Sequence, residues 1–415
     1  MQAQQAVPGL ACDVLVIGAG PAGSAAAHVL ARAGLKVLQI DQHPEGRDKV
    51  CGDGLIPDSH QALARLGLLD RVRAMARPVP HVRCVAPGGG HVDVPGRLSV
   101  LPRQQLDALL LGAAQAAGAR FLQARFEAPL EEDGRVVGAR ITVGHAEELV
   151  RAPWVLLATG AVPKALQAAG MCTRHTPSGV ALRGYVKAPS MVGRITGLEV
   201  VCSRAVRPGY GWIFPGPNGT FNIGAGVTDA YSAVDGKGQK VAPNLRGLFD
   251  AFVADYPPAA ALMREGTLVG ELKGAPLRCT LEGARHTRPG LMVIGEAAGS
   301  TYSFTGEGIG KAMQTGMAAA DALLSLEPAA QREPSVADDE RVRSAYEAAL
   351  LALLPKFRMY ERANAVNATP WFLDLLIWCA RRSPRLVQRM QGVLEETSNP
   401  GHVVGLRGLW RILTT

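Results

Sequence analysis

The sequence predicts an α/β protein in which a Rossmann-like dinucleotide-binding domain holds an inserted β-sheet domain and is followed by C-terminal helices. Three observations predict this class. Near the start of the chain a buried strand runs into a GxGxxG motif and an Ala-rich helix. A long segment, residues 178–274, is rich in β-branched residues, Gly and Pro. The last part of the chain, beyond residue 339, is helical in pattern and basic.

Composition excludes several classes of protein. The chain has 415 residues, 47% apolar and 19% charged, which allows two domains or one large domain with insertions and excludes wholesale disorder. No apolar run approaches the ~20 residues that a spanning helix needs, and the best candidate, residues 371–380, contains Asp374. The first apolar stretch has no basic segment before it, so we expect a strand rather than a signal peptide. Seven cysteines without a CxxC pair indicate a reducing compartment, so we expect a cytoplasmic protein without a metal site.

The first elements form a complete dinucleotide-binding fingerprint. Residues 13–17 are predicted as a buried parallel strand, and residues 21–33 as a helix that Gly34 caps. A second strand, residues 36–40, ends at Asp41. Strand, GxGxxG, helix, strand and acid therefore follow one another in about thirty residues, which is a far more specific signal than a GxGxxG motif alone.

Each glycine of the motif has a physical task. Gly18 permits the tight turn, Gly20 lets the backbone approach a pyrophosphate, and Gly23 lets the helix pack closely on the strand. The helix N-terminus around Ala22 offers free N–H groups to the phosphates. The Asp41 carboxylate can accept a hydrogen bond from a ribose hydroxyl, and its charge argues against a 2′-phosphate there.

Shorter elements follow up to the middle of the chain. In order they are a helix at 58–68, strands at 83–85 and 91–94 joined by 87–90, a helix at 103–117, a β-meander at 119–150 with a turn at 133–134, and a buried strand at 154–158 that ends in Thr159-Gly160.

The second half returns to the first domain and then becomes helical. Residues 291–294 are predicted as a buried strand before Gly295-Glu296, residues 308–326 as a helix, and residues 327–339 as a Pro- and acid-containing linker. The predicted domain organisation is therefore the first part of a dinucleotide-binding domain, of the kind that binds FAD, at 1–177, a mainly β substrate domain at 178–285, the last part of the first domain at 286–326, and a helical region at 327–415.

Positive charge is concentrated at the C-terminus. The chain carries +8 overall, and from Arg341 to the end 11 Lys/Arg face 5 Asp/Glu, a net +6 that leaves +2 for the rest. A solvated basic helical face explains this pattern, and so does contact with an anionic membrane surface, an acidic carrier protein or a substrate diphosphate. Nucleic acid is disfavoured because no recognised binding module accompanies the charge.

Four motifs together resemble the geranylgeranyl reductase family, within the flavin hydroxylase-like group of FAD enzymes. They are KVCGDGLIP at 49–57, ALRGYV at 181–186, GYGWIFP at 209–215 and GEAAG…TGEGIGKAM at 295–313, and the resemblance covers residues 12–325. It implies an FAD-binding domain with a substrate domain, and an enzyme that reduces carbon–carbon double bonds of isoprenoid chains through reduced FAD. The expected partner is a hydrophobic small molecule.

The resemblance also implies which residues form the site. Residues 305–309 (TGEGI) precede a helix whose N-terminus would face the flavin N1/O2 edge, and Glu296 stands where relatives have an Asp that binds the ribityl chain. Cys51 either donates the proton that completes the reduction or shapes the pocket. The cofactor-binding set is Gly18, Gly20, Ala22, Gly23, Asp41, Gln42, Cys51, Gly52, Arg103, Thr159, Gly160, Gly295, Glu296, Gly306, Gly308 and Ile309. The catalytic set is Cys51, Tyr210 and Trp212, and Tyr185, Tyr210 and Trp212 would form an aromatic wall for the substrate.

Plain alternatives exist for some of these residues: Arg103 as a surface arginine, and the aromatic residues as ordinary core. Two departures from the wider group also matter. Thr159-Gly160 replaces a usual Asp-Gly, so the electron donor stays open between NAD(P)H and ferredoxin, and residues 302–304 lack a usual proline.

Two other function classes remain open. GYGWIFP has the spacing of the halogenase motif GWxWxIP with Tyr210 and Phe214 substituted, which leaves a flavin monooxygenase or halogenase, acting on an aromatic or polyketide-like substrate, as the alternative. A non-catalytic flavin-binding partner protein with a basic C-terminus is the third class.

An apolar stretch near the C-terminus allows two interpretations. Residues 371–378 are almost wholly apolar, and Arg381, Arg382 and Arg385 follow at once. A buried helix explains the apolar residues, whereas a helix lying in a membrane interface explains both the aromatic side chains and the arginines. We therefore expect peripheral, salt-sensitive binding to anionic membranes.

Overall fold

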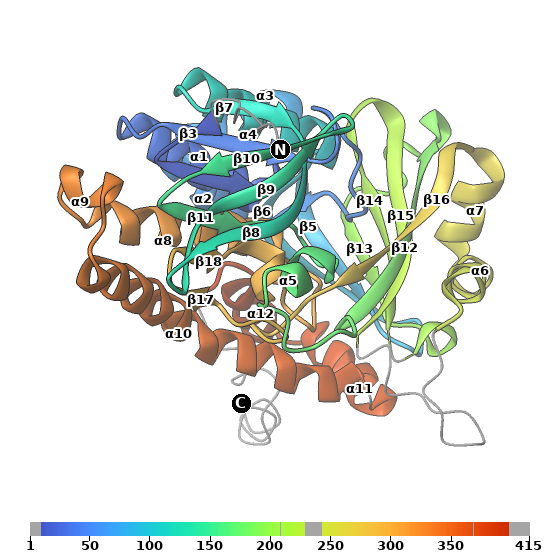
Figure 1. Cartoon of the computed structure of the whole chain (residues 1–415). Helices are drawn as coiled ribbons and strands as arrows, with labels where there is room; N and C mark the ends of the chain where they lie inside the picture. The colour runs from blue at the N-terminus through green and yellow to red at the C-terminus, as the bar shows by residue number, and fades with distance from the viewer. Residues whose placement is uncertain (1–9, 208, 229–242, 368, 398–415) are drawn as a thin grey trace, which may run out of the picture.

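The computed structural model describes residues 10–207, 209–228, 243–367 and 369–397 (Figure 1). Its first body is a six-stranded sheet in the order β17-β18-β11-β2-β3-β7, in which all pairs except β17–β18 are parallel. The strands are β2 (Val14–Ile17), β3 (Val37–Asp41), β7 (Arg120–Gln123), β11 (Trp154–Leu157), β17 (Thr287–Arg288) and β18 (Leu291–Val293). Strand β7 was expected in the β-meander, but it pairs with β3 and extends this parallel sheet instead.

Both faces of the six-stranded sheet are covered, which is why β2 and β11 are apolar throughout. On one face Val14 and Val16 pack against helices, and on the other Leu15 and Ile17 pack against a four-stranded sheet in the order β1-β10-β9-β8. Those strands are β1 (Leu10–Ala11), β8 (Arg125–Glu132), β9 (Arg135–Val143) and β10 (Ala146–Arg151). The helices are α1 (Pro21–Arg32), α4 (Arg103–Ala116) and α8 (Ile309–Leu324).

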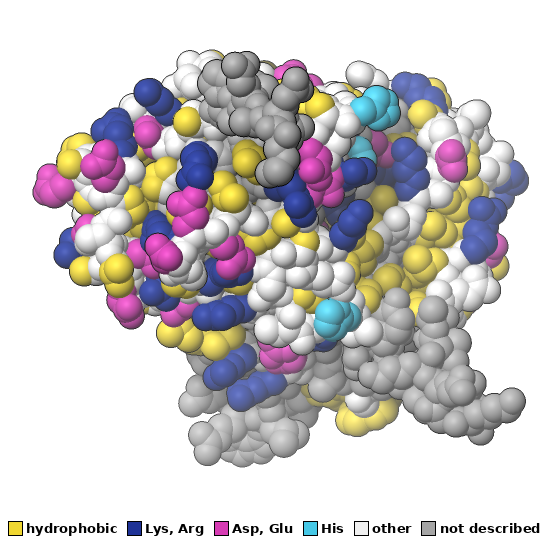
Figure 2. Space-filling view, in the orientation of Figure 1, with side chains coloured by type: hydrophobic (Ala, Val, Ile, Leu, Met, Phe, Trp, Pro, Cys, Tyr) yellow, Lys and Arg dark blue, Asp and Glu magenta, His cyan; other side chains and the backbone are white. Residues whose placement is uncertain are grey.

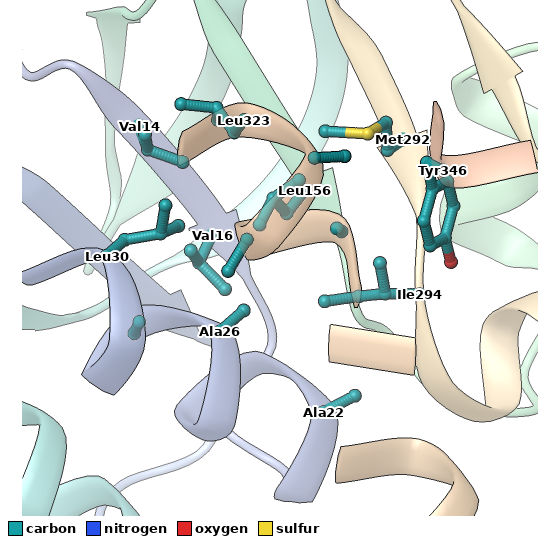
Figure 3. Packing of buried hydrophobic residues seen from close by; sticks show 14 of the residues in the cluster. Val14, Val16, Ala22, Ala26, Leu30, Leu156, Met292, Ile294, Leu323 and Tyr346 are labelled. Carbon is teal, nitrogen blue, oxygen red and sulfur yellow. The ribbon is translucent and has the colours of Figure 1, made fainter. Parts of the chain in front are cut away.

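Close packing of α1 on α8 depends on small side chains. Figure 3 shows Leu30 and Ala26 of α1 beside Val16 of the sheet, and Ala22, Ala26, Leu30 and Leu323 belong to one buried cluster. A Cβ at Gly316 of α8 would overlap the carbonyl oxygen of Ala22. The two helices that bracket the nucleotide-binding end of the sheet, far apart in the chain, therefore meet almost backbone to backbone.

The second body is an eight-stranded sheet in the order β16-β12-β15-β14-β13-β5-β6-β4. Its strands are β4 (Gly54–Leu55), β5 (Arg77–Val85), β6 (His91–Val100), β12 (Gly179–Lys187), β13 (Leu198–Val201), β14 (Tyr210–Pro215), β15 (Thr220–Thr228) and β16 (Thr267–Leu277). The predicted domain limits do not follow the sheets, because residues 54–100, which were assigned to 1–177, supply three of these strands. The parallel pair β5–β13 joins the two segments.

One face of the eight-stranded sheet packs against helices, and the other lines a cavity. Alternate residues Gly211 and Ile213 of β14 face the helices α6 (Leu245–Asp255) and α7 (Pro257–Glu265), where a Cβ at Gly211 would overlap the Phe252 ring. Tyr210, Trp212 and Phe214 face the opposite way, toward the six-stranded sheet and the cavity between the two bodies. Of the small helices, α2 (Pro57–Arg65) and α3 (Leu69–Met75) pack in one cluster with α4 and α8, and α5 (Lys164–Ala168) packs against the four-stranded sheet.

The C-terminal region consists of α9 (Pro328–Arg332), α10 (Val336–Asn367), α11 (Pro370–Ala380) and α12 (Pro384–Leu394). The predicted linker at 327–339 instead contains α9 and the start of α10, where Asp339 is buried and accepts a hydrogen bond of 2.8 Å from the Gly290 backbone N–H. Helices α11 and α12 cover part of β5 and β6, and Asp374 accepts a 2.7 Å bond from the Gly88 N–H. Within the described residues no helix is both long and apolar enough to cross a membrane.

Candidate active site

The predicted nucleotide-binding segments meet at one edge of the six-stranded sheet. Strands β2, β3, β11 and β18 run parallel, so their carboxyl ends lie together. Those ends lead into the GxGxxG turn, Asp41, Thr159-Gly160 and Gly295-Glu296. A cavity of about 340 Å³ lies between this edge and the eight-stranded sheet. Of the predicted site residues, it is lined by Gly20, Ala22, Asp41, Gln42, Cys51, Gly52, Arg103, Thr159, Gly160, Tyr210, Trp212, Glu296, Gly306, Gly308 and Ile309.

The GxGxxG glycines divide into packing and lining positions. Gly18 has φ +118° and a Cβ there would overlap the Ala158 carbonyl oxygen, while a Cβ at Gly23 would overlap the Gly18 carbonyl oxygen. Neither residue lines the cavity, and their role is to bring α1 against the end of β2. Gly20 does line it, and helix α1 begins there without a side-chain cap. The first N–H groups of α1 are therefore free to bind an anion.

Two guanidinium groups lie beside Gly20. A Cβ at Gly20 would be 3.4 Å from Nη2 of Arg47 and 4.0 Å from Nη2 of Arg103. Arg103 is 7% exposed and forms a bidentate pair with Asp107 at 2.8 Å, so it is not a surface arginine. Burial by itself would lower the pKa of Arg103, but Asp107 raises it above its ordinary value, so the charge is retained. A diphosphate at Gly20 would meet a helix N-terminus and two cations.

Asp41 is held in place by the backbone. Its carboxylate accepts 2.9 Å hydrogen bonds from the N–H groups of Ala19 and His43, and Arg47 Nε lies 3.6 Å away. The carboxylate is thereby fixed at the end of β3 beside the cavity, where a ribose hydroxyl could still reach it.

The segments after β11 and β18 supply further polar groups at the same edge of the six-stranded sheet. Glu296 lines it and lies 3.6 Å from Lys49 Nζ. Gly295 does not line the cavity; at φ +66° it lets the chain pass Ala22 of α1. The Thr159 hydroxyl is buried with no hydrogen-bond partner among the described residues, although it lines the cavity. The unpaired Thr159 hydroxyl, together with Gly20 beside the Arg47 and Arg103 guanidinium groups, fits the FAD that the motifs imply.

The TGEGI segment forms the N-terminus of α8 at the cavity. Gly308 is the N-cap of this 16-residue helix, with no side-chain cap. The Tyr210 hydroxyl donates a 2.6 Å hydrogen bond to the Thr305 carbonyl, and Gly306 at φ +69° leaves room for that hydroxyl. Glu307, between Gly306 and Gly308 in the chain, lines the cavity, and burial raises the pKa of its carboxyl to about 8. An anionic ring edge placed here would face free N–H groups and a protonated carboxyl at neutral pH.

Cys51 lies on the loop that joins the two bodies. Cys51 is among the residues that line the cavity, and its sulfur accepts a 3.4 Å hydrogen bond from the Asp53 backbone N–H. Burial raises the pKa of the Cys51 thiol, and the Arg103 guanidinium opposes that rise. The group is therefore a thiol at neutral pH, with a proton to give and a cation nearby to stabilise the thiolate.

An apolar strip of the eight-stranded sheet forms the other wall of the cavity. Trp212 and Phe214 of β14 are joined by Val82 of β5 and by Leu198 and Val200 of β13, at alternate strand positions. The predicted aromatic wall needs one correction, because Tyr185 does not line the cavity. Its hydroxyl donates a 2.6 Å bond to Asp53, and its ring lies under the Arg183 guanidinium, 4.1 Å from ring centroid to Cζ.

Sequence reasoning missed several residues of this site. Arg47, Lys49 and Glu307 line the cavity, and Asn222 of β15 holds the Cys51 loop. Arg47 and Lys49 could have been found as cations in the loop after Asp41, and Glu307 as the one ionisable residue of TGEGI. Nothing in the sequence singles out Asn222, whose role depends on its position opposite Tyr185 and Phe214 across two strand pairs. Over the part of the chain that is described, no three His, Cys, Asp or Glu side chains are grouped to hold a metal ion.

Comparison with known proteins places this chain among FAD-binding proteins. A family described as the FAD binding domain matches residues 11–190. The menaquinone reductase of Mycolicibacterium smegmatis is 32% identical over 369 residues, covering 83% of this chain and 85% of that protein. The digeranylgeranylglycerophospholipid reductase of Methanoculleus marisnigri is 29% identical, covering 74% of this chain and 75% of that protein.

Solved structures share the fold over nearly the whole chain. A geranylgeranyl bacteriochlorophyll reductase-like protein from Thermoplasma acidophilum superposes with a TM-score of 0.73 at 22% identity, covering 98% of this chain and 96% of that one. A flavin-dependent brominase superposes almost as well, with a TM-score of 0.72 at 18% identity, covering 97% and 98%. Fold similarity alone therefore does not separate reduction from halogenation.

Proposed function

Because the chain belongs to the geranylgeranyl reductase family of FAD-dependent oxidoreductases, we propose that it reduces carbon–carbon double bonds in the isoprenoid chain of a lipid. The observation that carries the proposal is that the apolar strip of Val82, Leu198, Val200, Trp212 and Phe214 lines the same cavity as Cys51 and the N-terminus of α8. An extended hydrocarbon chain would lie on that strip beside the groups that handle charge.

The chain's own residues would hold the cofactor and complete the reduction. Reduced FAD, when bound, supplies a hydride, which carries both electrons to one alkene carbon. Free N–H groups at the start of α1, with Arg47 and Arg103, would hold its diphosphate, and the N-terminus of α8 would hold the flavin ring. Cys51 would give its thiol proton to the second carbon, so that the alkene gains two hydrogens, and the thiolate would regain a proton from water.

The names of the relatives suggest the class of substrate. Menaquinone and digeranylgeranylglycerophospholipid share a polyprenyl chain and differ in the head group, a quinone in one and a glycerophospholipid in the other. We propose a prenyl lipid of one of these two kinds. The reductant that returns the flavin to its reduced form is either NAD(P)H or a reduced ferredoxin.

We also propose that this enzyme is cytoplasmic and binds peripherally to anionic membranes through α11 and α12. Trp371 and Trp378 are 67% and 50% exposed, although other apolar side chains of α11 are buried against β5 and β6. Arg382 stacks on Trp378 at 4.0 Å. In Figure 2, hydrophobic side chains are visible at the lower edge of the molecule, where Figure 1 places α11. Exposed tryptophans beside arginines suit a lipid–water interface better than an acidic carrier protein.

The place of these helices supports the same proposal. On β5, Val82 lines the cavity while Cys84, two residues on, packs against the α11–α12 cluster. On β13, which pairs with β5, Val200 lines the cavity, and Cys202, just after the strand, packs against the same cluster of α11 and α12 side chains. The apolar face of the sheet thus continues from the cavity to side chains that α11 and α12 cover, so these helices lie next to the proposed site for the prenyl chain.

Lipid analysis tests the proposed reaction. The purified protein with FAD and dithionite, under argon, is incubated with a menaquinone and, separately, with a digeranylgeranylglycerophospholipid, and products are measured by mass spectrometry. We expect one lipid to gain two hydrogens per bond reduced, without oxygen. A product that forms only when oxygen is admitted, or that contains oxygen or halogen, would overturn the proposal in favour of a monooxygenase or halogenase.

A further inference from the structure

A buried carboxylate, that of Asp53, lies at the centre of the contacts around the Cys51 loop. Asp53 is 0% exposed. Its Oδ2 accepts hydrogen bonds from the Tyr185 hydroxyl at 2.6 Å and from Asn222 Nδ2 at 2.7 Å. Its Oδ1 accepts a 3.2 Å bond from the Arg103 backbone N–H. The same carboxylate therefore connects β12 and β15 of the eight-stranded sheet to Arg103, the first residue of α4.

The bonds around Asp53 also fix the thiol. Asn222 Nδ2 donates a second hydrogen bond, 2.7 Å, to the Cys51 carbonyl, and the Asp53 N–H donates to the Cys51 sulfur. Trp212 Nε1 orients Asn222 by donating to its Oδ1 at 2.9 Å. Asn222 and Asp53 thus both donate hydrogen bonds to Cys51, one to its carbonyl oxygen and one to its sulfur.

The local backbone requires such anchoring. Asp53 has φ +67°, a left-handed conformation that costs free energy for any residue but Gly, although Asp tolerates it better than most. The Phe214 ring lies against the neighbours Gly52 and Gly54 and leaves little room for a side chain at either. A Cβ would be 2.9 Å from the ring at Gly52 and 3.3 Å from it at Gly54. With a glycine on each side, the loop has little stiffness of its own and would move if Asp53 released its partners.

We propose that Asp53 is a positioning residue for Cys51. It holds the thiol beside the apolar strip, and its hydrogen bonds to Tyr185 and Asn222 fix the position of the Cys51 loop relative to the eight-stranded sheet. The inference rests on the proposed function in that Cys51 is taken as the proton donor. Asp53 is among the residues that line the cavity, and its carboxylate is occupied by hydrogen bonds from Tyr185, Asn222 and the Arg103 N–H. It acts through the loop, and its backbone N–H stabilises the sulfur when the proton has left.

Two variants test the proposal on the FAD-loaded protein. Asp53→Asn removes the charged acceptor, and Tyr185→Phe removes one donor and keeps the ring on Arg183. Hydrogen exchange of residues 48–56, measured by mass spectrometry, should become faster in both variants. Prenyl-lipid turnover should fall by roughly 10²-fold in Asp53→Asn, the loss expected when a reacting group is misplaced by about 1 Å. The FAD content should stay at the wild-type level.

A matched control and a double variant distinguish positioning from general stability. Glu199→Gln changes another buried carboxylate bonded to a tyrosine, Tyr256 at 3.0 Å, on the opposite face of the sheet, and should leave exchange of 48–56 unchanged. In a Cys51→Ala background, Asp53→Asn should cause no further loss of turnover, because its effect passes through the thiol. A full additional loss in that background would overturn the proposal, as would unchanged exchange in Asp53→Asn.

The exchange measurement does not depend on the reaction. If Cys51→Ala keeps wild-type turnover while Asp53→Asn still loosens residues 48–56, then the proton-donor role of Cys51 has failed, and the positioning of the loop by Asp53 has not.

Discussion

One glycine governs how closely a diphosphate can approach helix α1. Gly20 lines the cavity between the free N–H groups of α1 and the guanidinium groups of Arg47 and Arg103. A side chain at this position would occupy the space that the phosphates need, whereas the protein itself would tolerate it, since only the ends of long side chains lie nearby.

We therefore expect Gly20→Val to fold and to be purified without flavin. The wild-type protein should be yellow with one FAD per chain. Absorbance at the flavin band and the circular dichroism spectrum measure the two properties. Gly112→Val, on the outer side of α4 with no neighbour within 4 Å of its Cβ, is the matched control and should keep its FAD. Full flavin occupancy in Gly20→Val would refute the placement of the diphosphate.

A second residue-scale prediction concerns Glu307. Burial raises the pKa of its carboxyl from 4.5 to about 8, so the folded protein retains a proton that the unfolded chain releases. Stability from this group is complete at low pH and is lost as pH rises from about 4.5 to about 8. The amide in Glu307→Gln has no proton to lose in this range, so the variant lacks this pH-dependent contribution to stability.

The free energy of unfolding of the FAD-free Glu307→Gln variant should accordingly fall less than that of wild type between about pH 6 and about pH 8. Urea unfolding at a series of pH values measures the slope. Glu333→Gln, at an exposed position, should follow the wild-type slope. Parallel curves for Glu307→Gln and wild type would show that Glu307 is ionised throughout.

At the scale of elements, α11 combines the two interpretations that its sequence allowed. Leu373, Leu376 and Ile377 are buried against the sheet, while Trp371 and Trp378, seven residues apart, project from the same outer side. Seven residues are two helical turns, so one face of the helix packs and the other meets solvent. The helix is thus held by the protein and can still present aromatic side chains to a membrane.

We expect an Arg381, Arg382 and Arg385 triple alanine variant to bind anionic vesicles more weakly than wild type, by about 1 kcal/mol for each arginine near the surface. Co-sedimentation with phosphatidylglycerol vesicles at low and high salt measures the binding. The control is a triple alanine variant at Arg65, Arg71 and Arg73, which are exposed on α2 and α3, away from α11 in Figure 1. Equal partitioning of the two variants, or no binding by wild type, would leave α11 as a packing helix alone.

At the scale of the whole molecule, the candidate cofactor site is built from segments that lie almost 290 residues apart. Gly20, Arg47 and Thr159 come from one part of the chain, and Glu296 and Gly308 from another, across the inserted strands of the second sheet. A ligand that contacts all of them binds only the folded chain, so its binding energy adds to the stability of the fold.

Removing FAD should therefore lower the unfolding temperature of the whole chain in one transition, and adding it back should restore that temperature. At ~1,000 times its dissociation constant, free FAD should add ~4 kcal/mol to the free energy of unfolding. Thermal unfolding of the FAD-free protein at increasing FAD concentrations measures the shift. Riboflavin, which lacks the diphosphate, should give a much smaller one. An unfolding temperature that is the same with and without FAD would contradict a site that spans both segments.

The sequence by itself determined the parts of this protein that depend on neighbouring residues. Strand, GxGxxG, helix and acid are adjacent in the chain, and the structure has them as β2, α1 and β3 with Asp41 at the end. Arg103 at the start of its helix and the helix after TGEGI were predicted for the same reason. Most predicted site residues consequently line one cavity, because parallel strands bring their carboxyl ends to one edge.

Only the tertiary structure decided how distant strands pair, and with them the roles of Tyr185, Asn222 and Asp53. Residues 77–100 join residues 179–277 in one sheet, although hydrophobic periodicity in either segment says nothing about its partner. The pairing places Asn222 opposite Tyr185 and brings both to Asp53, which turns a predicted substrate contact into an anchor for the Cys51 loop. Local patterns report which residues are buried and in which kind of element, whereas hydrogen bonds between distant residues depend on the register that the whole fold selects.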